Sequence, residues 1–316
     1  MKFKVGIVGC GGIGNAHAAA WTRLGAELAA VCDLNPERAA AMAEKYSSTA
    51  YTDPTRLPRD LDAVSVVTPP AAHYGVVKTL LENNYNVFCE KPFTTDVAQG
   101  EELLALARER RRKVAVGFKM RYEPVFIAAK KFLPEIGTLR SIVTTKQQMF
   151  HAKPETMWVT RTGAMYELSI HDFDLVSYIT GRLPQRVLAA KLEHRRNWEK
   201  EDGFYAMVDY GDGITANLQG MYCDETVFCF RDLCITFLGE KGYMRVERPD
   251  RIVLHTDAFR VEEIGKAERN AFDLELEAFR DSILGVPGAA APSAEDAVRM
   301  TELVESIRTF DNSLQK

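Results

Sequence analysis

The sequence predicts an α/β protein with a doubly wound parallel sheet followed by an α+β domain with a large, open, mostly antiparallel sheet. Strand-like and helix-like segments alternate over residues 1–121, which is typical of parallel sheets. Over residues 122–316, long strand-like stretches follow one another through tight turns before two closing helices. A chain of 316 residues also exceeds what one hydrophobic core normally holds. We therefore expect two domains, 1–121 and 122–316.

In the first domain, apolar runs read as strands and alternate with amphipathic helices. The run 62–68 is almost continuously apolar, as expected for a parallel strand buried on both faces. Asn35 and Pro36 provide an N-cap and a first-turn proline for one helix. The expected strands are 4–8, 26–32, 62–68, 86–90 and 113–118, and the expected helices are 15–24, 36–46, 72–83 and 96–112.

In the second domain, the sequence between Tyr210 and Gly213 and the sequence between Gly239 and Gly242 read as hairpin turns. Ser293 is expected to cap the final helix, with an acid three residues later. The expected strands are 138–149, 186–194, 203–222, 230–238 and 242–247, and the expected helices are 124–133, 270–284 and 294–311. The segment 166–179 also has apolar residues at roughly helical spacing.

Composition excludes several functional classes. A net charge of −4 and a pI near 6.0 argue against a nucleic-acid-binding protein. No apolar run reaches the ~20 residues of a membrane span, and a strand at the N-terminus leaves no room for a signal peptide. The six cysteines form no C-x-x-C or His/Cys cluster, so we expect reduced thiols, no metal site and a cytoplasmic location.

A glycine-rich turn is the most informative motif. Gly9, Gly11 and Gly14 follow the first strand in a G-x-G-x-x-G spacing. Gly9 would permit a tight turn, Gly11 a close approach of the backbone to a pyrophosphate, and Gly14 close packing of helix against strand. The helix N-terminus adds free N–H groups and partial positive charge. We therefore predict a dinucleotide-binding Rossmann domain rather than an ordinary βαβ unit; the phosphate-binding residues would be Gly9, Gly11, Gly12, Ile13 and Gly14.

The acid at the end of the second strand indicates which dinucleotide binds. Asp33 lies nineteen positions after Gly14, where a carboxylate accepts hydrogen bonds from the adenosine ribose. Its charge would repel the 2′-phosphate of NADP. Arg38 is near enough in sequence to contribute to the site but lies a turn into the next helix. NAD is thus favoured over NADP.

Two further segments carry candidate chemistry. Lys91 follows Glu90 at the carboxyl end of a predicted parallel strand, where ligands of such sheets bind, although an ordinary surface lysine is the alternative. Glu167, His171 and Asp174 stand at i, i+4 and i+7 of a predicted helix. A histidine between carboxylates can act as a general base. The alternative is a solvated acidic stripe with an incidental histidine.

These features together resemble one family. The glycine turn, the Glu-Lys-Pro at residues 90–92 and the acid-x-x-x-His-x-x-Asp on a helix are similar to the Gfo/Idh/MocA oxidoreductases. Thr68 and Pro69, followed by His73, resemble the turn at the end of a family strand. Arg121 resembles the family's exit from the Rossmann domain. The resemblance covers essentially the whole chain.

The resemblance also implies roles for residues. Lys91 would bind the substrate hydroxyl and the nicotinamide ribose, supported by Glu90, and His171 would be the catalytic histidine. Glu167 stands where inositol dehydrogenases carry an aspartate, which leaves the substrate open. We expect Thr68, Pro69, His73 and Glu90 at the cofactor, with His73 capping its helix rather than catalysing. The expected substrate contacts are Lys91, Arg121, Trp158, Arg161, Tyr166, Glu167, His171 and Asp174.

The resulting hypothesis is NAD(P)-dependent hydride transfer between nicotinamide and a secondary alcohol of a sugar, cyclitol or related polyol. Two alternatives stay open. One is an enzyme that retains NAD and uses transient oxidation for elimination or glycoside cleavage. The other is an inactive NAD-binding sensor. The resemblance further implies that the open sheet forms a subunit interface, so we expect a homodimer or homotetramer.

Overall fold

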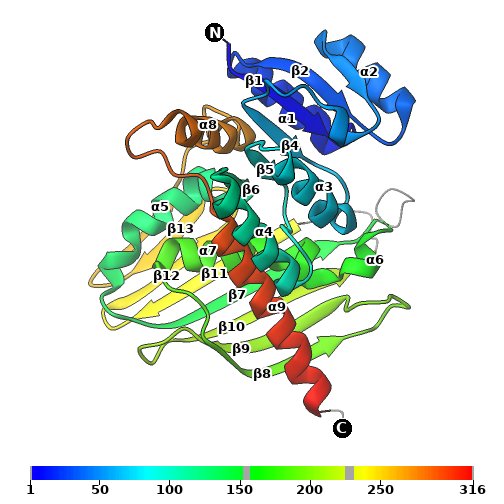
Figure 1. The fold of residues 1–316 in the computed structure, drawn as a ribbon. Helices are drawn as coiled ribbons and strands as arrows, with labels where there is room; N and C mark the ends of the chain where they lie inside the picture. Colours follow the sequence, from blue (N-terminus) through cyan, green and yellow to red (C-terminus); the bar gives the residue numbers. More distant parts are fainter. Residues whose placement is uncertain (1, 152–156, 225–230, 315–316) are drawn as a thin grey trace. The chain divides into compact units, whose positions relative to one another are not determined.

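The computed structural model describes residues 2–151, 157–224 and 231–314, and it divides into two compact units (Figure 1). Unit 1 contains Met1–Lys119 and Arg269–Val298; unit 2 contains Met120–Glu268 and Arg299–Lys316. The first change of unit falls close to the expected boundary at residue 121. The division differs from the expected one because Arg269–Val298 returns to unit 1 rather than staying with the second domain.

Unit 1 is built on a six-stranded sheet in the order β3-β2-β1-β4-β5-β6. All of its strand pairs are parallel, which confirms the predicted doubly wound sheet. The short, largely exposed edge strand β3 was not expected from the sequence. The strands are β1 (Lys4–Val8), β2 (Glu27–Cys32), β3 (Thr49–Tyr51), β4 (Ala63–Val66), β5 (Val87–Cys89) and β6 (Val114–Val116).

The helices of unit 1 begin where the sequence supplies caps. The Asn35 side chain accepts hydrogen bonds from the N–H groups of Glu37 and Arg38, as predicted. One helix from the returning segment, α8, packs against α1, where Leu276 and Phe279 join the core that contains Trp21. The helices are α1 (Gly12–Arg23), α2 (Pro36–Tyr46), η1 (Pro54–Arg56), α3 (Pro70–Glu82), α4 (Val97–Arg110) and α8 (Ala271–Leu284).

Unit 2 contains an eight-stranded sheet in the order β14-β13-β12-β11-β7-β10-β9-β8. It is antiparallel except for the β7–β10 pair, which confirms the predicted mostly antiparallel sheet. The last two strands, short and flanked by charged residues, were not expected. The strands are β7 (Leu139–Met149), β8 (Arg186–Glu193), β9 (Gly203–Asp209), β10 (Thr215–Cys223), β11 (Arg231–Gly239), β12 (Gly242–Glu247), β13 (Arg251–His255) and β14 (Phe259–Glu263).

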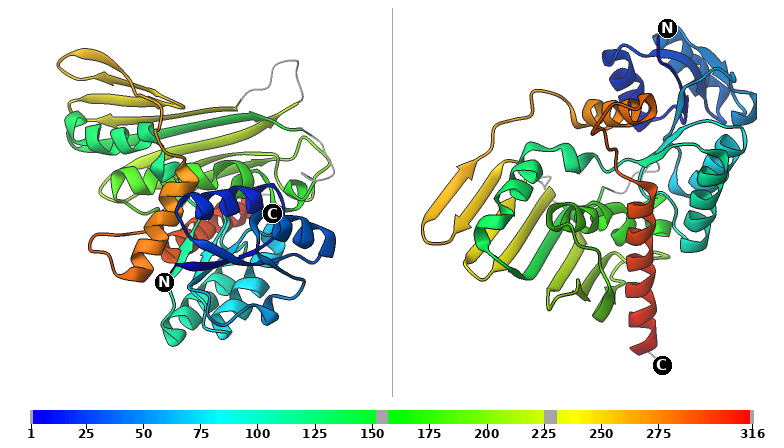
Figure 2. Two further views of the ribbon diagram at one scale, coloured as in Figure 1. Left: turned by 90° about the horizontal axis from the view of Figure 1, so that it is seen from above. Right: turned by 60° about the vertical axis from the view of Figure 1, so that its left-hand side comes forward.

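Helices cover one face of this sheet (Figure 2). Phe173 of α7 packs edge-on against Phe204 of β9, with ring centroids 5.5 Å apart. The final helix α9 starts in unit 1 and continues in unit 2, and the Ser293 hydroxyl accepts the N–H of Asp296, as predicted. The remaining described helices, of which η2 and α9 begin in unit 1, are η2 (Lys119–Tyr122), α5 (Pro124–Phe132), η3 (Leu133–Ile136), α6 (Val159–Thr162), a π-helical turn (Met165–Ser169), α7 (Ile170–Thr180) and α9 (Ala294–Leu314).

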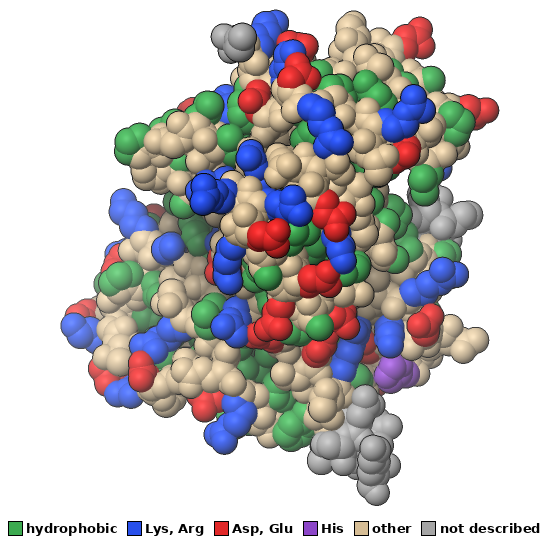
Figure 3. Space-filling model, in the orientation of Figure 1, with side chains coloured by type: hydrophobic (Ala, Val, Ile, Leu, Met, Phe, Trp, Pro, Cys, Tyr) green, Lys and Arg blue, Asp and Glu red, His purple; other side chains and the backbone are tan. Residues whose placement is uncertain are grey.

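Among the described residues, no helix is both long and apolar enough to cross a bilayer. On the face drawn in Figure 3, Lys and Arg side chains are intermingled with Asp and Glu. The described cysteines are free thiols, and Cys229 lies outside the described residues.

Candidate active site

The turn between β1 and α1 requires glycine at two positions. Gly9 has a φ of +109°, and a Cβ there would lie 2.6 Å from the carbonyl oxygen of Val67. A Cβ on Gly14 would lie 2.0 Å from the carbonyl oxygen of Gly9. The expected tight turn and close helix packing are therefore both present.

The outer part of the same turn is open. Apart from the neighbouring residues in the chain and the backbone of the helix itself, no atom of the described residues lies within 4 Å of a Cβ built on Gly11 or Gly12, and Ile13 is 46% exposed. Gly11 is the N-cap of α1 and offers no side chain, so the first N–H groups of the helix point outward without intrahelical acceptors. This is the geometry that binds a phosphate, and the residues fit the diphosphate of a dinucleotide.

Asp33 follows β2 next to this turn. Its Oδ2 accepts the N–H of Cys10 at 2.8 Å, and its Oδ1 accepts the N–H of Asn35 at 2.8 Å. The carboxylate is thus held at the strand end, only partly exposed. Burial, followed by the nearby Asp33 charge, raises the pKa of the Cys10 thiol to about 12. Arg38 is exposed on α2.

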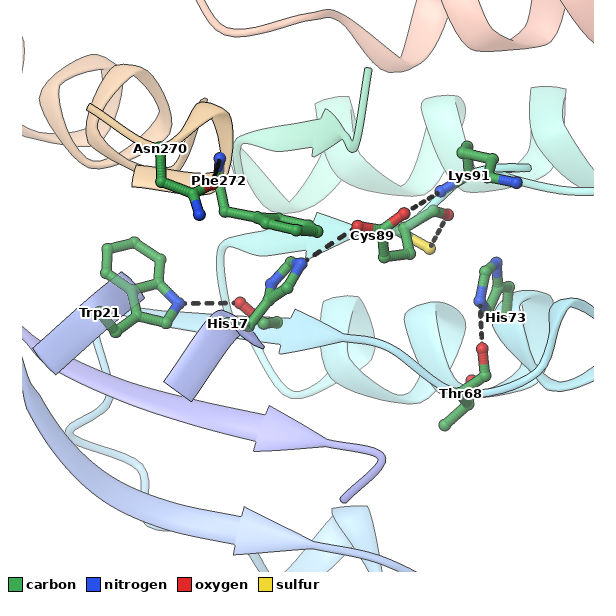
Figure 4. A network of polar contacts seen from close by, with 10 residues as sticks. His17, Trp21, Thr68, His73, Cys89, Lys91, Asn270 and Phe272 are labelled. Carbon is green, nitrogen blue, oxygen red and sulfur yellow. Dashed lines mark hydrogen bonds and ion pairs between the residues drawn. The ribbon is translucent and has the colours of Figure 1, made fainter. Parts of the chain in front are cut away.

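Glu90 links His17 and Lys91, which are both labelled in Figure 4, in one polar network. Its Oε1 lies 3.1 Å from Nε2 of His17, and its Oε2 accepts the backbone N–H of Lys91 at 3.1 Å. Burial favours the neutral acid, but His17 first, then the charges of Lys119 and Lys91, leave the pKa of Glu90 below its ordinary value. His17 is fully buried.

His73 connects the loops that follow two neighbouring strands. Its Nδ1 lies 2.7 Å from the carbonyl oxygen of Pro92, and its Nε2 lies 2.8 Å from that of Thr68. Burial lowers the pKa of this imidazole in spite of both carbonyls. Its ring is fully buried with both nitrogens facing the backbone, so it supports the loops and leaves no ring nitrogen for a ligand. Thr68 is half-buried and Pro69 is exposed.

His171 lies in the first turn of α7 and is 4% exposed. Glu167 is partly exposed in the π-helical turn that precedes α7. The predicted regular spacing of Glu167, His171 and Asp174 is therefore wrong at its first step, because a π turn contains more residues than an α turn. The prediction holds from His171 onward, where the helix is regular.

Arg121 and Asp174, which were both expected to contact substrate, form an ion pair with each other. The Arg121 guanidinium donates to both carboxylate oxygens of Asp174, with Nε at 2.9 Å from Oδ2. The Asp174 side chain is 2% exposed and that of Arg121 is 15% exposed. Arg121 also lies 5.5 Å from the ring centroid of Tyr178. We conclude that this pair fixes α7, with Asp174 buried beneath the surface.

A second ion pair, which we did not expect from the sequence, anchors the same helix. Nζ of Lys146, on β7, lies 2.9 Å from Oδ1 of Asp172. Burial lowers the pKa of Lys146 and raises that of Asp172, and the attraction between the two groups opposes both shifts. The sequence did contain one sign of this pair. Apolar and polar residues alternate along β7 in a way that places Lys146 on the buried face, where a lysine needs an acidic partner.

The three residues expected to contact substrate before α7 occupy different environments. Arg161 is exposed on α6. Trp158 is partly buried against the cluster formed by Val159, Ala164, Leu168 and Tyr222. Tyr166 is fully buried, and the Arg308 guanidinium lies 5.0 Å from its ring centroid. The Tyr166 ring is thus packed in the core of unit 2, and its contact with a substrate stays a prediction.

Both units match models of one known protein family. Residues 3–118 match the family model described as "Oxidoreductase family, NAD-binding Rossmann fold" (GFO_IDH_MocA), and residues 134–313 match the model of the same family's C-terminal alpha/beta domain. These matches span most of the chain.

Individual relatives are more distant. The chain is 30% identical to the inositol 2-dehydrogenase of Rhizobium meliloti (strain 1021) over 60% of this chain and 58% of that protein. It is 30% identical to the UDP-N-acetylglucosamine 3-dehydrogenase of Acidithiobacillus ferrooxidans over 69% of this chain and 66% of that protein. The matched stretches thus cover less than two thirds of either relative. The solved structure of the latter enzyme, GnnA, superimposes over 100% of both chains with a TM-score of 0.86 at 24% identity.

Proposed function

Because this chain belongs to the Gfo/Idh/MocA oxidoreductase family, we propose that it oxidises a secondary alcohol of a sugar, cyclitol or related polyol reversibly with a nicotinamide dinucleotide. The names of the two relatives support this class, since an inositol 2-dehydrogenase and a UDP-N-acetylglucosamine 3-dehydrogenase both act on ring hydroxyls. The observation that carries the proposal is the open glycine turn beside Asp33, combined with the Glu90 network that supports Lys91.

The proposed roles divide the chemistry among three side chains. Bound NAD⁺ supplies the hydride acceptor. Lys91 holds the reacting hydroxyl and stabilises developing alkoxide charge with its ammonium group. His171 accepts the hydroxyl proton as general base, and Glu167 orients the same substrate. Both Lys91 and Glu167 also restrict the substrate to one orientation, because hydride transfer needs close and aligned carbon atoms.

We infer a preference for NAD over NADP from Asp33. Two backbone N–H groups hold its carboxylate in place at the end of β2. A fixed negative charge there accepts hydrogen bonds from ribose hydroxyls and repels a 2′-phosphate. Arg38 is the residue that would reduce this preference if it reached the ribose.

We also propose that the open face of the eight-stranded sheet joins copies of this chain into a homodimer or homotetramer. Val143, Met207 and the intervening Asn217 are aligned across three strands, and Tyr205 follows on the same face. Val143, Met207 and Tyr205 are 38–42% exposed and border a groove of about 380 Å³. An apolar sheet face of this kind is normally covered by a partner. Light scattering should give a mass of at least two chains, and Met207→Lys should reduce it, whereas the exposed control Leu284→Lys in unit 1 should not.

A substrate panel tests the proposed activity. Purified protein is incubated with NAD⁺ or NADP⁺ and with inositols, aldoses, sugar acids and UDP-N-acetylglucosamine, while NADH absorbance is recorded. The proposal expects stoichiometric NADH with at least one compound and a higher kcat/KM for NAD⁺. Tightly bound NAD that excess substrate never converts into released NADH, together with substrate cleavage, would favour the non-redox alternative. NAD binding with no turnover of any compound would favour the sensor.

A further inference from the structure

One buried carboxyl group has no assigned role in the proposed reaction. Glu275 lies on α8 and is fully buried. Neither of its carboxylate oxygens has a hydrogen-bond partner among the described residues. A charged carboxylate in that position would lose its hydration with no hydrogen bond in return, which is unfavourable. The side chain must therefore gain a proton, a hydrogen bond or a ligand.

Its neighbours come from three other segments of unit 1. One ligand atom from each of Glu275, Glu90 and His17 lies within 4.8 Å of the other two. His17 belongs to α1, which packs against α8, and Glu90 follows β5. The charged groups that face this cluster are the ammonium groups of Lys119 and Lys91. The charge of Lys119 lowers the pKa of both carboxyl groups, and the charge of Lys91 lowers that of Glu90.

The two carboxyl groups are not equivalent. Glu90 already faces His17 and accepts the N–H of Lys91, so its negative charge is stabilised. Glu275 lies near the same imidazole, but neither of its oxygens has a hydrogen-bond partner among the described residues, and the charges that act on it are those of Glu90 and Lys119. Two adjacent carboxylates in a desolvated site cannot both ionise at neutral pH, and the proton goes to the one with fewer donors. Burial, then the Glu90 charge, accordingly raises the pKa of Glu275 well above its ordinary value.

A divalent cation is the other occupant that such donors could hold. Two carboxylates and an imidazole are suitable ligands. However, Lys119 already supplies positive charge to both carboxyl groups, and its Nζ is held 4.1 Å from the ring centroid of Phe272. A cation would add charge next to that ammonium group. The arrangement favours a shared proton.

We propose that Glu275 is a neutral carboxylic acid that donates a hydrogen bond to Glu90, and so acts as a positioning residue for Lys91. The proton of Glu275 would satisfy both acids, fix the Glu90 carboxylate and orient the backbone N–H of Lys91 that Glu90 accepts. The effect on turnover rests on the proposed function of Lys91. The protonation state of Glu275 does not depend on that function.

The protonation state is tested by stability against pH. Wild type and Glu275→Gln are unfolded in urea at several pH values between 5 and 8, without cofactor. In the unfolded chain Glu275 ionises above about pH 4.3. Because its folded pKa is raised, the wild type loses stability as pH rises from there toward the folded pKa, whereas glutamine does not ionise. We expect the folding equilibrium constant of Glu275→Gln to gain on the wild type by up to about tenfold per pH unit.

Glu277→Gln is the matched control on the same helix. Arg269, which pairs with Glu277, lowers the pKa of that carboxyl, so its replacement should bring no gain that grows with pH. A difference between Glu275→Gln and wild type that stays constant from pH 5 to 8 would overturn the proposal. So would stabilisation of the wild type, but not of Glu275→Gln, by added Zn²⁺ or Mn²⁺, since that would show a cation site.

The positioning role is tested by turnover on a substrate identified in the panel. Glutamine keeps an N–H donor for Glu90, whereas Glu275→Leu removes every donor at similar size. We expect kcat of Glu275→Leu to be about tenfold below that of Glu275→Gln, with a shifted pH profile and little change in KM. Equal kcat and pH profiles for the two variants would overturn the positioning role. A protein that oxidises no polyol would refute the proposed function and would leave the urea result to decide the state of Glu275.

Discussion

Lys146 of β7 and Asp172 of α7 form an ion pair that is sealed from solvent, with Nζ 2.9 Å from Oδ1 and side chains 0% and 1% exposed. Asp172 is the residue directly after His171, so this pair fixes the helical turn that presents the proposed general base. The Arg121–Asp174 pair holds the next turn of α7. Asp172 and Asp174 thus each attach α7 to another segment through a buried or nearly buried ion pair, so the orientation of α7 is strongly constrained.

Removing one partner of the Lys146–Asp172 pair should lower the free energy of unfolding considerably. Lys146→Met leaves Asp172 as an uncompensated buried charge, and we expect a loss of about 3–5 kcal/mol in the free energy of unfolding. Lys146→Met combined with Asp172→Asn should recover part of that loss, because both charges are then gone. Urea denaturation measures each value. The exposed pair Arg182–Asp212 is the control, and Arg182→Met should change stability by less than about 1 kcal/mol. Equal losses at both sites would contradict the account.

Two substitutions in the glycine turn should affect folding and cofactor binding separately. Gly14→Ala places a Cβ against the backbone of Gly9, so we expect a loss of about 1–3 kcal/mol or more in stability. Gly11→Ala meets no atom of the described residues beyond its own neighbours in the chain, and it should keep a melting temperature close to that of the wild type. It should nevertheless weaken NAD binding in calorimetry, because its methyl group occupies the space proposed for the diphosphate. Unchanged NAD affinity of Gly11→Ala would place the phosphate elsewhere.

Gly117 is expected to keep Glu90 in position. A Cβ there would lie 2.9 Å from the Glu90 carboxyl carbon and 3.0 Å from each of its oxygens. The end of a flexible side chain can move, so Gly117→Ala should fold, but Glu90 would leave His17 and Lys91. We expect a roughly 10- to 100-fold lower kcat. Gly75→Ala, on α3 with open space around it, is the control and should keep full turnover. Retained kcat in Gly117→Ala would show that the position of Glu90 is unimportant.

Replacing Asp33 tests the preference for NAD. Asp33→Asn keeps the acceptor for one N–H but removes the negative charge. Asp33→Ala removes both. We expect the ratio of kcat/KM for NAD⁺ to that for NADP⁺ to fall in both variants, and the KM for NAD⁺ to rise most in Asp33→Ala. Steady-state kinetics with each cofactor measures the ratio. A ratio that stays at the wild-type value in both variants would contradict the proposed role of Asp33.

Features governed by local sequence were predictable. The strand, glycine turn and helix around Gly9 follow from steric rules that act within a few residues, and so do the caps at Asn35 and Ser293. The alternation of strands and helices predicted the parallel sheet for the same reason. Short strands were missed where burial on one face is weak, as in β3 and β14.

Features governed by distant contacts were not predictable. Lys146 and Asp172 meet only because β7 and α7 pack together, and no spacing in the sequence relates them. The π turn at Met165–Ser169 shifts Glu167 relative to His171, and a hydrophobic pattern of period 3.6 cannot reveal it. Likewise, the carboxyl group of Glu275 reaches Glu90 only because Arg269–Val298 returns to unit 1.

The central claim is that Lys91 and His171 act on the same substrate hydroxyl, and kcat measured alongside NAD affinity tests it most directly. Lys91→Met and His171→Asn are compared with Lys113→Met and His255→Asn, which replace the same residue types outside the proposed site. We expect the first two variants to lose roughly 10²–10⁴-fold in kcat while NAD dissociation constants stay within about threefold of wild type. The two control variants should keep wild-type kcat. Wild-type turnover by either Lys91→Met or His171→Asn on a confirmed substrate would contradict the account.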